Sequence, residues 1–211
     1  MKDIKVILFD IDGTLLDTTE FILQPTEYAL RECGYPVPDR SIIKKLVGIP
    51  FPDYYVELSG SALHVEKMVQ VHRDFQAANF GLAQIFPGSL ETLQELKKKG
   101  YKMAAITSRG KRTAHQSLVN AGIRDFFDVL VVFEDTEEKK PHPAPLFKAL
   151  EDLHEVPEHA VMIGDSHFDI EAGKAAGTKT IRATYGFHAD HLHDPEPDFV
   201  IQDITDLLKI L

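Results

Sequence analysis

Cysteine and long apolar runs are both scarce in this chain of 211 residues. Cys33 is the only cysteine, so no disulfide can form within the chain, and a reducing compartment is expected. No apolar run approaches the ~20 residues that a membrane-spanning helix needs. Only six residues, 4–9, lie between Met1-Lys2-Asp3 and Asp10, which is too little for a signal peptide. We therefore expect a cytoplasmic protein without a membrane anchor.

Basic residues are also in deficit. The 23 lysines and arginines are outnumbered by 33 acidic residues, and the formal net charge is −10. Nucleic acids are bound by basic surfaces, so they are not expected as partners. Small phosphates stay open, because a bound divalent cation reverses the local field. With 44% apolar and 27% charged residues, the chain is typical of a globular protein with one large domain, or a core domain with a small insertion.

Apolar runs rich in β-branched residues alternate with helical patterns along most of the chain. Strands are predicted at 4–9, 102–107, 128–133, 160–163, 178–183 and, from a weaker run, 199–201. Helices are predicted at 89–99, 111–121, 143–154 and 168–176. Alternation of this kind predicts an α/β fold with a doubly wound parallel sheet.

Residues 17–81 interrupt the alternation. Helices are expected there at 18–33, 39–47, 52–59 and 62–79, with no strand. We interpret this block as a helical insertion after the first strand, and we assign 1–16 and 82–211 to the core domain. Pro25 falls inside the first insertion helix, where it removes a backbone hydrogen bond and either kinks the helix or resets its start.

The first strand is followed by Asp10-Ile-Asp12-Gly13-Thr14. Asp10 and Asp12 are two residues apart, so their side chains can face the same side of an extended chain. One carboxylate can serve as nucleophile and the other as proton donor, provided that their environments differ. Gly13 permits a tight turn, through which backbone amides can approach phosphate oxygens. The structural alternative is that this segment caps a helix.

The strand at 102–107 ends in Thr107-Ser108-Arg109. A hydroxyl at this place can hydrogen-bond a phosphoryl oxygen, although serine and threonine at such a turn usually cap the next helix. Arg109, Lys111 and Arg112 precede or begin that helix, where cations oppose the helix dipole. These cations either hold an anion or are simply solvated.

A lysine and two acids follow the later strands. Lys140-Pro141 opens the helix at 143–154, where Lys140 is either a surface residue or a counter-charge for a carboxylate and a phosphoryl group. Asp165 ends the strand at 160–163, and Asp169 comes four residues later. Such oxygen ligands suit Mg²⁺. The alternative for Asp165 or Ser166 is capping of the helix that follows.

Together, these four motifs resemble those of the haloacid dehalogenase (HAD) superfamily of phosphohydrolases, in the right order and over nearly the whole chain. The helical insertion falls where one subgroup of that family carries a mobile cap, and Phe86-Pro87-Gly88 matches the return from that cap. The length and layout are similar to those of phosphoglycolate phosphatases and of a pyrophosphatase branch. The resemblance implies a Rossmann-like core with a helical cap, Mg²⁺ as cofactor and a small phosphorylated metabolite as substrate.

The resemblance also implies a role for each motif. Asp10 attacks phosphorus and becomes an aspartyl-phosphate, while Asp12 protonates the departing oxygen and then activates water. Lys140 balances charge. Mg²⁺ is held by Asp10, the backbone carbonyl of Asp12 and Asp165, with Asp169 supporting that shell or Lys140.

The candidates for substrate binding are Gly13, Thr14, Thr107, Ser108 and Arg109. By the resemblance, Thr107 is the hydroxyl that matches the family motif, with Ser108 beside it. Asp12 argues against the dehalogenases that name the family, which lack an acid there. A phosphosugar mutase and a non-catalytic phospholigand-binding protein stay open as alternatives. Phosphate release would distinguish a hydrolase from a binding protein, and isomerisation without net release would identify a mutase.

Two further sets of residues carry weaker expectations. The substrate is expected to be selected by insertion residues, for which the candidates are Lys44, Lys45, residues 48–51, Tyr54 and Tyr55. Near the C-terminus, acids and prolines around three histidines favour a polar loop over a zinc site; these are His188, His191 and His193. The sequence does not indicate an oligomeric state.

Overall fold

The computed structural model describes residues 1, 3–47, 49–187 and 195–211. The chain forms two units, one made of Met1–Asp17 with Gln84–Leu211 and the other of Thr18–Ala83. Gly48 and the three histidines at 188–193 lie outside the described residues. Within the described part of the chain, no helix is both long enough and apolar enough to cross a membrane.

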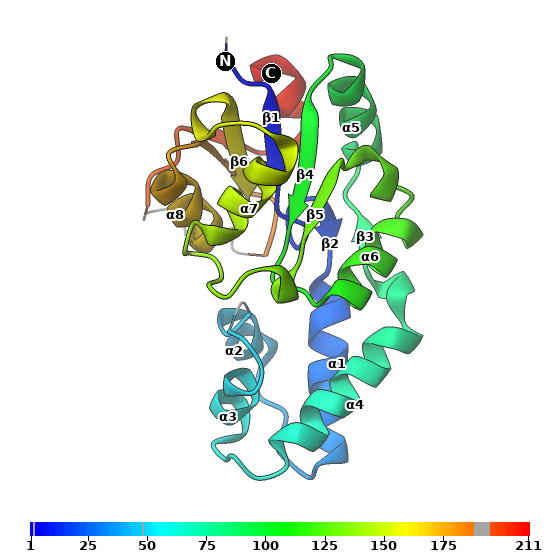
Figure 1. The fold of residues 1–211 in the computed structure, drawn as a ribbon. Helices are drawn as coiled ribbons and strands as arrows, with labels where there is room; N and C mark the ends of the chain where they lie inside the picture. Colours follow the sequence, from blue (N-terminus) through cyan, green and yellow to red (C-terminus); the bar gives the residue numbers. More distant parts are fainter. Residues whose placement is uncertain (2, 48, 188–194) are drawn as a thin grey trace. The chain divides into compact units, whose positions relative to one another are not determined.

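A parallel sheet of six strands organises the larger unit, in the order β5-β4-β1-β6-β7-β8. Figure 1 labels four of them, β5, β4, β1 and β6, side by side. The strands are β1 Val6–Phe9, β4 Lys102–Ile106, β5 Val129–Val131, β6 Ala160–Gly164, β7 Lys179–Ala183 and β8 Phe199–Ile201. The apolar runs form central strands because a parallel sheet covered on both faces buries every side chain of such a run. The predicted doubly wound α/β fold is confirmed.

The position of β1 creates the site. From β1 the chain proceeds to β4 and β5 on one side of it, and then returns to β6, β7 and β8 on the other side. Ligands in open α/β sheets bind at such a reversal, outside the carboxyl ends of the strands. Asp10, Thr107 and Asp165 directly follow β1, β4 and β6 respectively. Three of the sequence motifs therefore meet at this edge of the sheet.

Helices and loops cover the two faces of the sheet. The helices of this unit are α5 Ser89–Lys98, α6 Lys111–Asn120, α7 Ala144–Leu153, α8 His167–Ala176 and the short α9 Leu207–Ile210. Because side chains alternate along a strand, Leu8 packs with Leu146 and Leu150 of α7, whereas Phe9 points to the opposite face. There its ring meets Phe127 edge to face, with centroids 6.1 Å apart.

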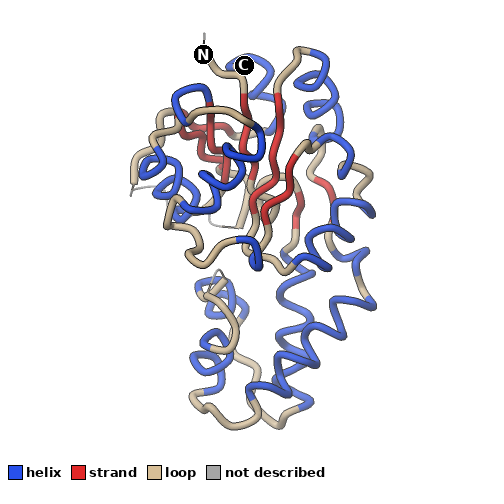
Figure 2. The backbone as a smooth tube through the Cα atoms, in the orientation of Figure 1, coloured by secondary structure: helices blue, strands red, loops and turns tan. Residues whose placement is uncertain are grey.

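The smaller unit is built mainly from helices (Figure 2). They are α1 Thr19–Glu32, α2 Arg40–Lys45, α3 Asp53–Ser59 and α4 Val65–Ala78. Tyr54 and Tyr55, which sequence analysis named as candidates to contact substrate, are 3% and 0% exposed and belong to the core of this unit. The Tyr55 hydroxyl lies 2.8 Å from His72 Nδ1 and the Tyr54 hydroxyl 2.9 Å from Thr26 Oγ1. The expectation for the two tyrosines was wrong, because their rings fill the helical core.

A short antiparallel ribbon connects the two units in sequence. It pairs β2 Leu16–Asp17 with β3 Gln84–Ile85, so the departing and returning segments lie side by side. Sequence analysis missed this ribbon because two-residue strands show no readable alternation of apolar and polar residues.

Pro25 lies inside α1, which continues through it. A proline has no N–H to donate to the carbonyl four residues earlier, here that of Phe21. Gln76 Nε2, from α4, donates to that carbonyl oxygen at 3.1 Å. A side chain from a neighbouring helix thus replaces the donor that proline lacks.

We expect Gln76→Ala to lower the free energy of unfolding by about 1 kcal/mol, because the Phe21 carbonyl loses this donor. Chemical denaturation measures the change. Gln70→Ala, on the same helix, is the matched control, since Gln70 is exposed and its side chain donates to the exposed Asp74 side chain. Equal stability losses in the two variants would contradict the compensating role of Gln76.

Candidate active site

Three buried carboxylates meet at the carboxyl end of the sheet. Asp10, Asp165 and Asp169 each place an oxygen within 4.8 Å of the others. Their residues are 6%, 1% and 1% exposed. Like charges this close repel one another and are poorly solvated, so the arrangement is costly without a cation. Hard oxygen donors in this number fit a divalent cation such as Mg²⁺.

Lys140 supplies a positive charge inside this group. Its Nζ donates to Asp10 Oδ1 at 2.7 Å, to Asp169 Oδ1 at 2.6 Å and to the Ile106 carbonyl at 3.2 Å. Burial alone would lower the pKa of the Lys140 ammonium, but Asp10 and Asp169 outweigh it and raise that pKa above its ordinary value. Lys140 is therefore a fixed cation, with each of its three donors directed to an oxygen.

The pKa of Asp10 is raised by its surroundings. Burial raises its pKa well above the ordinary value, Lys140 opposes that rise, and the carboxylates of Asp169, Asp12 and Asp165 add to it. One lysine thus does not offset the burial and the neighbouring negative charges. A divalent cation at this place would favour the ionised form of Asp10, the form that can act as a nucleophile.

Asp169 has two partners, one for each carboxylate oxygen. While Oδ1 accepts from Lys140, Oδ2 accepts from the Ser166 backbone N–H at 3.1 Å and from the Ser166 hydroxyl at 2.5 Å. Ser166 is the N-cap of α8, and its hydroxyl accepts from the Asp169 N–H in return. Helix capping and membership of the acidic group, which sequence analysis weighed as alternatives, occur together here.

Glycines allow the backbone to approach Asp165. Gly13 has φ +78°, and a Cβ there would lie 2.2 Å from Asp165 Oδ2. A Cβ at Gly186 would lie 2.1 Å from the Gly13 carbonyl oxygen and 2.5 Å from Asp165 Oδ2. Any side chain at either position would collide with the Asp165 carboxylate or its surroundings, so the site requires glycine at both.

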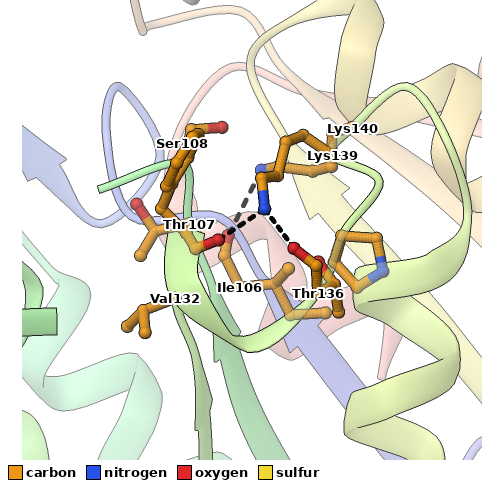
Figure 3. A pocket seen from close by; sticks show the side chains of 9 residues that line it. Ile106, Thr107, Ser108, Val132, Thr136, Lys139 and Lys140 are labelled. Atoms are coloured by element: carbon orange, nitrogen blue, oxygen red, sulfur yellow. Dashed lines mark hydrogen bonds between the residues drawn. The ribbon is translucent and has the colours of Figure 1, made fainter. Parts of the chain in front are cut away.

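Thr107 and Ser108 line one pocket together with Lys140 (Figure 3). Thr107 is 5% exposed, and its Oγ1 accepts from the Arg109 backbone N–H at 3.1 Å. The hydroxyl proton of Thr107 can therefore be donated to an incoming oxygen. Ser108 is exposed.

Thr14 lies in the first motif, and Lys139 directly precedes Lys140 in the chain. The Thr14 side chain is fully buried, and its backbone carbonyl accepts from the Tyr185 hydroxyl at 2.9 Å. Its substrate-binding role stays a prediction. Lys139 Nζ turns to the carbonyl oxygens of Phe133, at 2.6 Å, and of Thr136, so Lys140 alone of the two lysines contacts Asp10 in the described structure.

Asp12 lies in a different environment from Asp10. Arg109 Nε approaches Asp12 Oδ1 at 3.0 Å and Oδ2 at 2.8 Å, and Nη2 approaches Oδ1 at 2.5 Å. The other end of the guanidinium, Nη1, donates to Ser117 Oγ at 2.7 Å. The Arg109 side chain thus contacts Asp12 and Ser117, and its predicted role in substrate binding stays a prediction. Among the described residues, the acids that cluster within 4.8 Å do not include Asp12.

Sequence analysis missed four residues around the site: Ser117, Arg182, Tyr185 and Gly186. Arg182 is 1% exposed and pairs in register with Gly164. Burial lowers the pKa of its guanidinium, whereas Asp165 and Asp169 raise it. An arginine inside a β-branched run was a readable signal for a buried charge near the acids. Nothing in the sequence marked Ser117, Tyr185 or Gly186.

Comparison with known proteins agrees with this geometry. The family model described as haloacid dehalogenase-like hydrolase matches residues 7–183. Pyrophosphatase PpaX of Bacillus mycoides is 36% identical over 210 residues, which cover 99% of this chain and 97% of that protein.

Solved structures are similar over the full length. A predicted phosphoglycolate phosphatase from Haemophilus somnus has a TM-score of 0.93 and 25% identity, covering 100% of this chain and 99% of the other. A haloacid dehalogenase-like hydrolase from Streptococcus pneumoniae has a TM-score of 0.88 and 30% identity, with coverage of 100% and 99%. The resemblance in the four motifs is thus confirmed, and the chain belongs to the haloacid dehalogenase-like hydrolase family of enzymes.

Proposed function

We propose that this enzyme is a Mg²⁺-dependent phosphatase that forms an aspartyl-phosphate on Asp10. The observation that carries the proposal is the contact between Asp10 and the buried cation of Lys140, beside the carboxylates of Asp165 and Asp169. Mg²⁺ would be held by Asp10, Asp165 and the Asp12 carbonyl, with Asp169 supporting that set. When bound, it would neutralise charge on the phosphoryl group and on the nucleophile.

The chain's own residues then account for both chemical steps. An Asp10 oxygen forms a bond to phosphorus as the bond to the leaving oxygen breaks, and Asp12 gives that oxygen a proton. In the second step Asp12 takes a proton from water, whose oxygen bonds to phosphorus, releasing phosphate and restoring Asp10. Lys140 and the Thr107 hydroxyl bind the phosphoryl oxygens. Such transfers depend mainly on positioning and on charge neutralisation.

The substrate is proposed to be a small phosphorylated metabolite. Pyrophosphate is the first choice, because PpaX is named a pyrophosphatase and is similar over 99% of the chain. Phosphoglycolate is the second, from the name of the Haemophilus somnus protein. We further propose that Thr18–Ala83 is a cap, hinged at the β2–β3 ribbon, that excludes bulk water during turnover.

We expect the protein to release phosphate from pyrophosphate or phosphoglycolate only with Mg²⁺, and to act poorly on a phosphopeptide. A panel of pyrophosphate, phosphoglycolate, sugar phosphates and a phosphopeptide, compared by kcat/KM, tests this.

Asp10→Asn should lose nearly all turnover. Full activity in that variant or in excess chelator would overturn the mechanism, and sugar-phosphate isomerisation without net phosphate release would identify a mutase instead. A clear preference for the phosphopeptide would contradict the cap.

Asp12→Asn should slow hydrolysis most for substrates with poor leaving groups, because protonation of the departing oxygen matters most there. The measurement is kcat/KM for alkyl and aryl phosphates of graded leaving-group pKa. An equal loss across the series would contradict a proton-donor role for Asp12.

Asp10→Asn should also raise the midpoint temperature of unfolding by a few degrees at neutral pH in chelator. The Asp10 pKa is raised in the folded protein, so its ionised form destabilises the metal-free fold. This gain should disappear as the pH falls below the ordinary value of 3.8, where wild-type Asp10 is protonated in both states.

Thermal unfolding with and without Mg²⁺ measures both effects. Saturating Mg²⁺ should stabilise the wild type more than Asp10→Asn, because ligand binding to the folded state raises its stability. Asp125→Asn, at an exposed position, is the matched control. A lower midpoint for Asp10→Asn in chelator would show that the Lys140 contact outweighs the burial of charge.

A further inference from the structure

Arg109 forms an ion pair with Asp12 at the edge of the site. Three N–H···O contacts of 2.5 to 3.0 Å join its guanidinium to the Asp12 carboxylate. The side chains of Arg109 and Asp12 are 11% and 23% exposed, so the pair is mostly shielded from solvent. We infer that Arg109 is a positioning residue that sets the orientation of the Asp12 carboxylate, and that it is not an anchor for the substrate phosphate. This inference rests on the proposed function, because it assigns work to Asp12.

Arg109 is itself held from more than one side. Its Nη1 donates to Ser117 Oγ on α6 at 2.7 Å, and Ser117 is 1% exposed. Its backbone N–H donates to Thr107 Oγ1 at 3.1 Å. A guanidinium is a rigid planar fork, so contacts on both of its ends fix the plane in which it meets a carboxylate. The orientation of Asp12 is therefore connected to α6 and to the end of β4.

The separation of Asp12 from the acidic group needs such a partner. Asp12 is two residues from Asp10, and a cation bound by Asp10, Asp165 and Asp169 would attract any further carboxylate nearby. Among the described residues, the oxygens that gather within 4.8 Å belong to those three acids. The ion pair with Arg109 keeps the Asp12 side chain outside that group. In this position Asp12 can exchange protons with the leaving oxygen and with water.

An anchor for the substrate and a positioning residue have different kinetic consequences. If Arg109 binds substrate phosphate, its loss raises KM. If it orients Asp12, its loss lowers kcat, because misplacement of a reacting group by about 1 Å can cost a hundredfold in rate. A loss of folding alone also lowers the apparent kcat at unchanged KM, because it reduces the amount of active enzyme, but it lowers it equally for every leaving group. A kcat loss that is larger for the poorer leaving group therefore separates misplacement of Asp12 from a loss of folded protein.

The experiment compares Arg109→Met, Arg109→Lys and Ser117→Ala with the wild type, on the preferred substrate and on an aryl phosphate. We expect Arg109→Met to lower kcat by roughly ten- to a hundredfold with KM within about twofold, and to affect the poorer leaving group more. Arg109→Lys should recover part of kcat, because it restores the charge but not the fork. Ser117→Ala should give a smaller loss of the same kind. Arg112→Met is the matched control, since Arg112 is an exposed cation three residues after Arg109, in the first turn of α6.

A double-mutant cycle with Asp12→Asn completes the test. If Arg109 acts through Asp12, the double variant should be as active on the aryl phosphate as Asp12→Asn alone. If the activity losses of the two single variants multiply in the double variant, the inference is overturned. A raised KM with unchanged kcat in Arg109→Met would also overturn it. Either result would leave the proposed function intact. The proposed function fails separately, if the wild type releases no phosphate or Asp10→Asn retains full activity. Thermal unfolding and its shift by Mg²⁺ establish that each variant is folded. If Arg109→Met does not fold, the kinetics of Arg109→Lys test the inference in its place.

Discussion

The Lys140 ammonium is the contact on which the site depends. It lies between Asp10 and Asp169 and also donates to the Ile106 carbonyl, so it joins the loops that follow β1 and β4 to the start of α8. Removing Lys140 would leave the buried Asp10 and Asp169 carboxylates without their counter-charge, and an uncompensated buried charge costs several kcal/mol. The three segments can therefore approach one another only because a fixed cation lies among their oxygens.

The same contact does not balance the charge of the site. Asp10, Asp165 and Asp169 bring three carboxylates together, and the pKa of Asp10 is raised in spite of Lys140. Residual negative charge of this kind is unfavourable for folding but suits a divalent cation and, through it, an anionic substrate. Gly13 and Gly186 also shape the site, because the absence of side chains at these two positions lets the backbone lie close to the Asp165 carboxylate. The fold thus accepts a local cost where the chemistry is proposed to take place.

Two aspartates of one short motif have separate surroundings. Asp10 is 6% exposed and contacts Lys140, whereas the partly exposed Asp12 side chain contacts Arg109. A nucleophile and a proton-transfer group work in different protonation states, and a divalent cation bound beside Asp10 would favour the ionised form that a nucleophile needs. The two aspartates differ in their surroundings because of residues that follow other strands. Arg109 follows β4 in the chain, and Lys140 follows β5. The parallel order of the sheet brings both to the loop after β1.

The sequence by itself determined the order and type of the six sheet strands and of the longer helices, but not the β2–β3 ribbon, because apolar periodicity and turn residues act locally. It also placed Asp10, Thr107 and Asp165 at strand ends, where a parallel sheet collects them. Only the tertiary structure decided which side chains meet. The pairing of Arg109 with Asp12 joins positions 97 apart, and that of Lys140 with Asp10 joins positions 130 apart. Such contacts depend on strand order, on turn geometry and on which face of a neighbouring helix is turned inward, and none of these is set by the residues next to the pair in the chain.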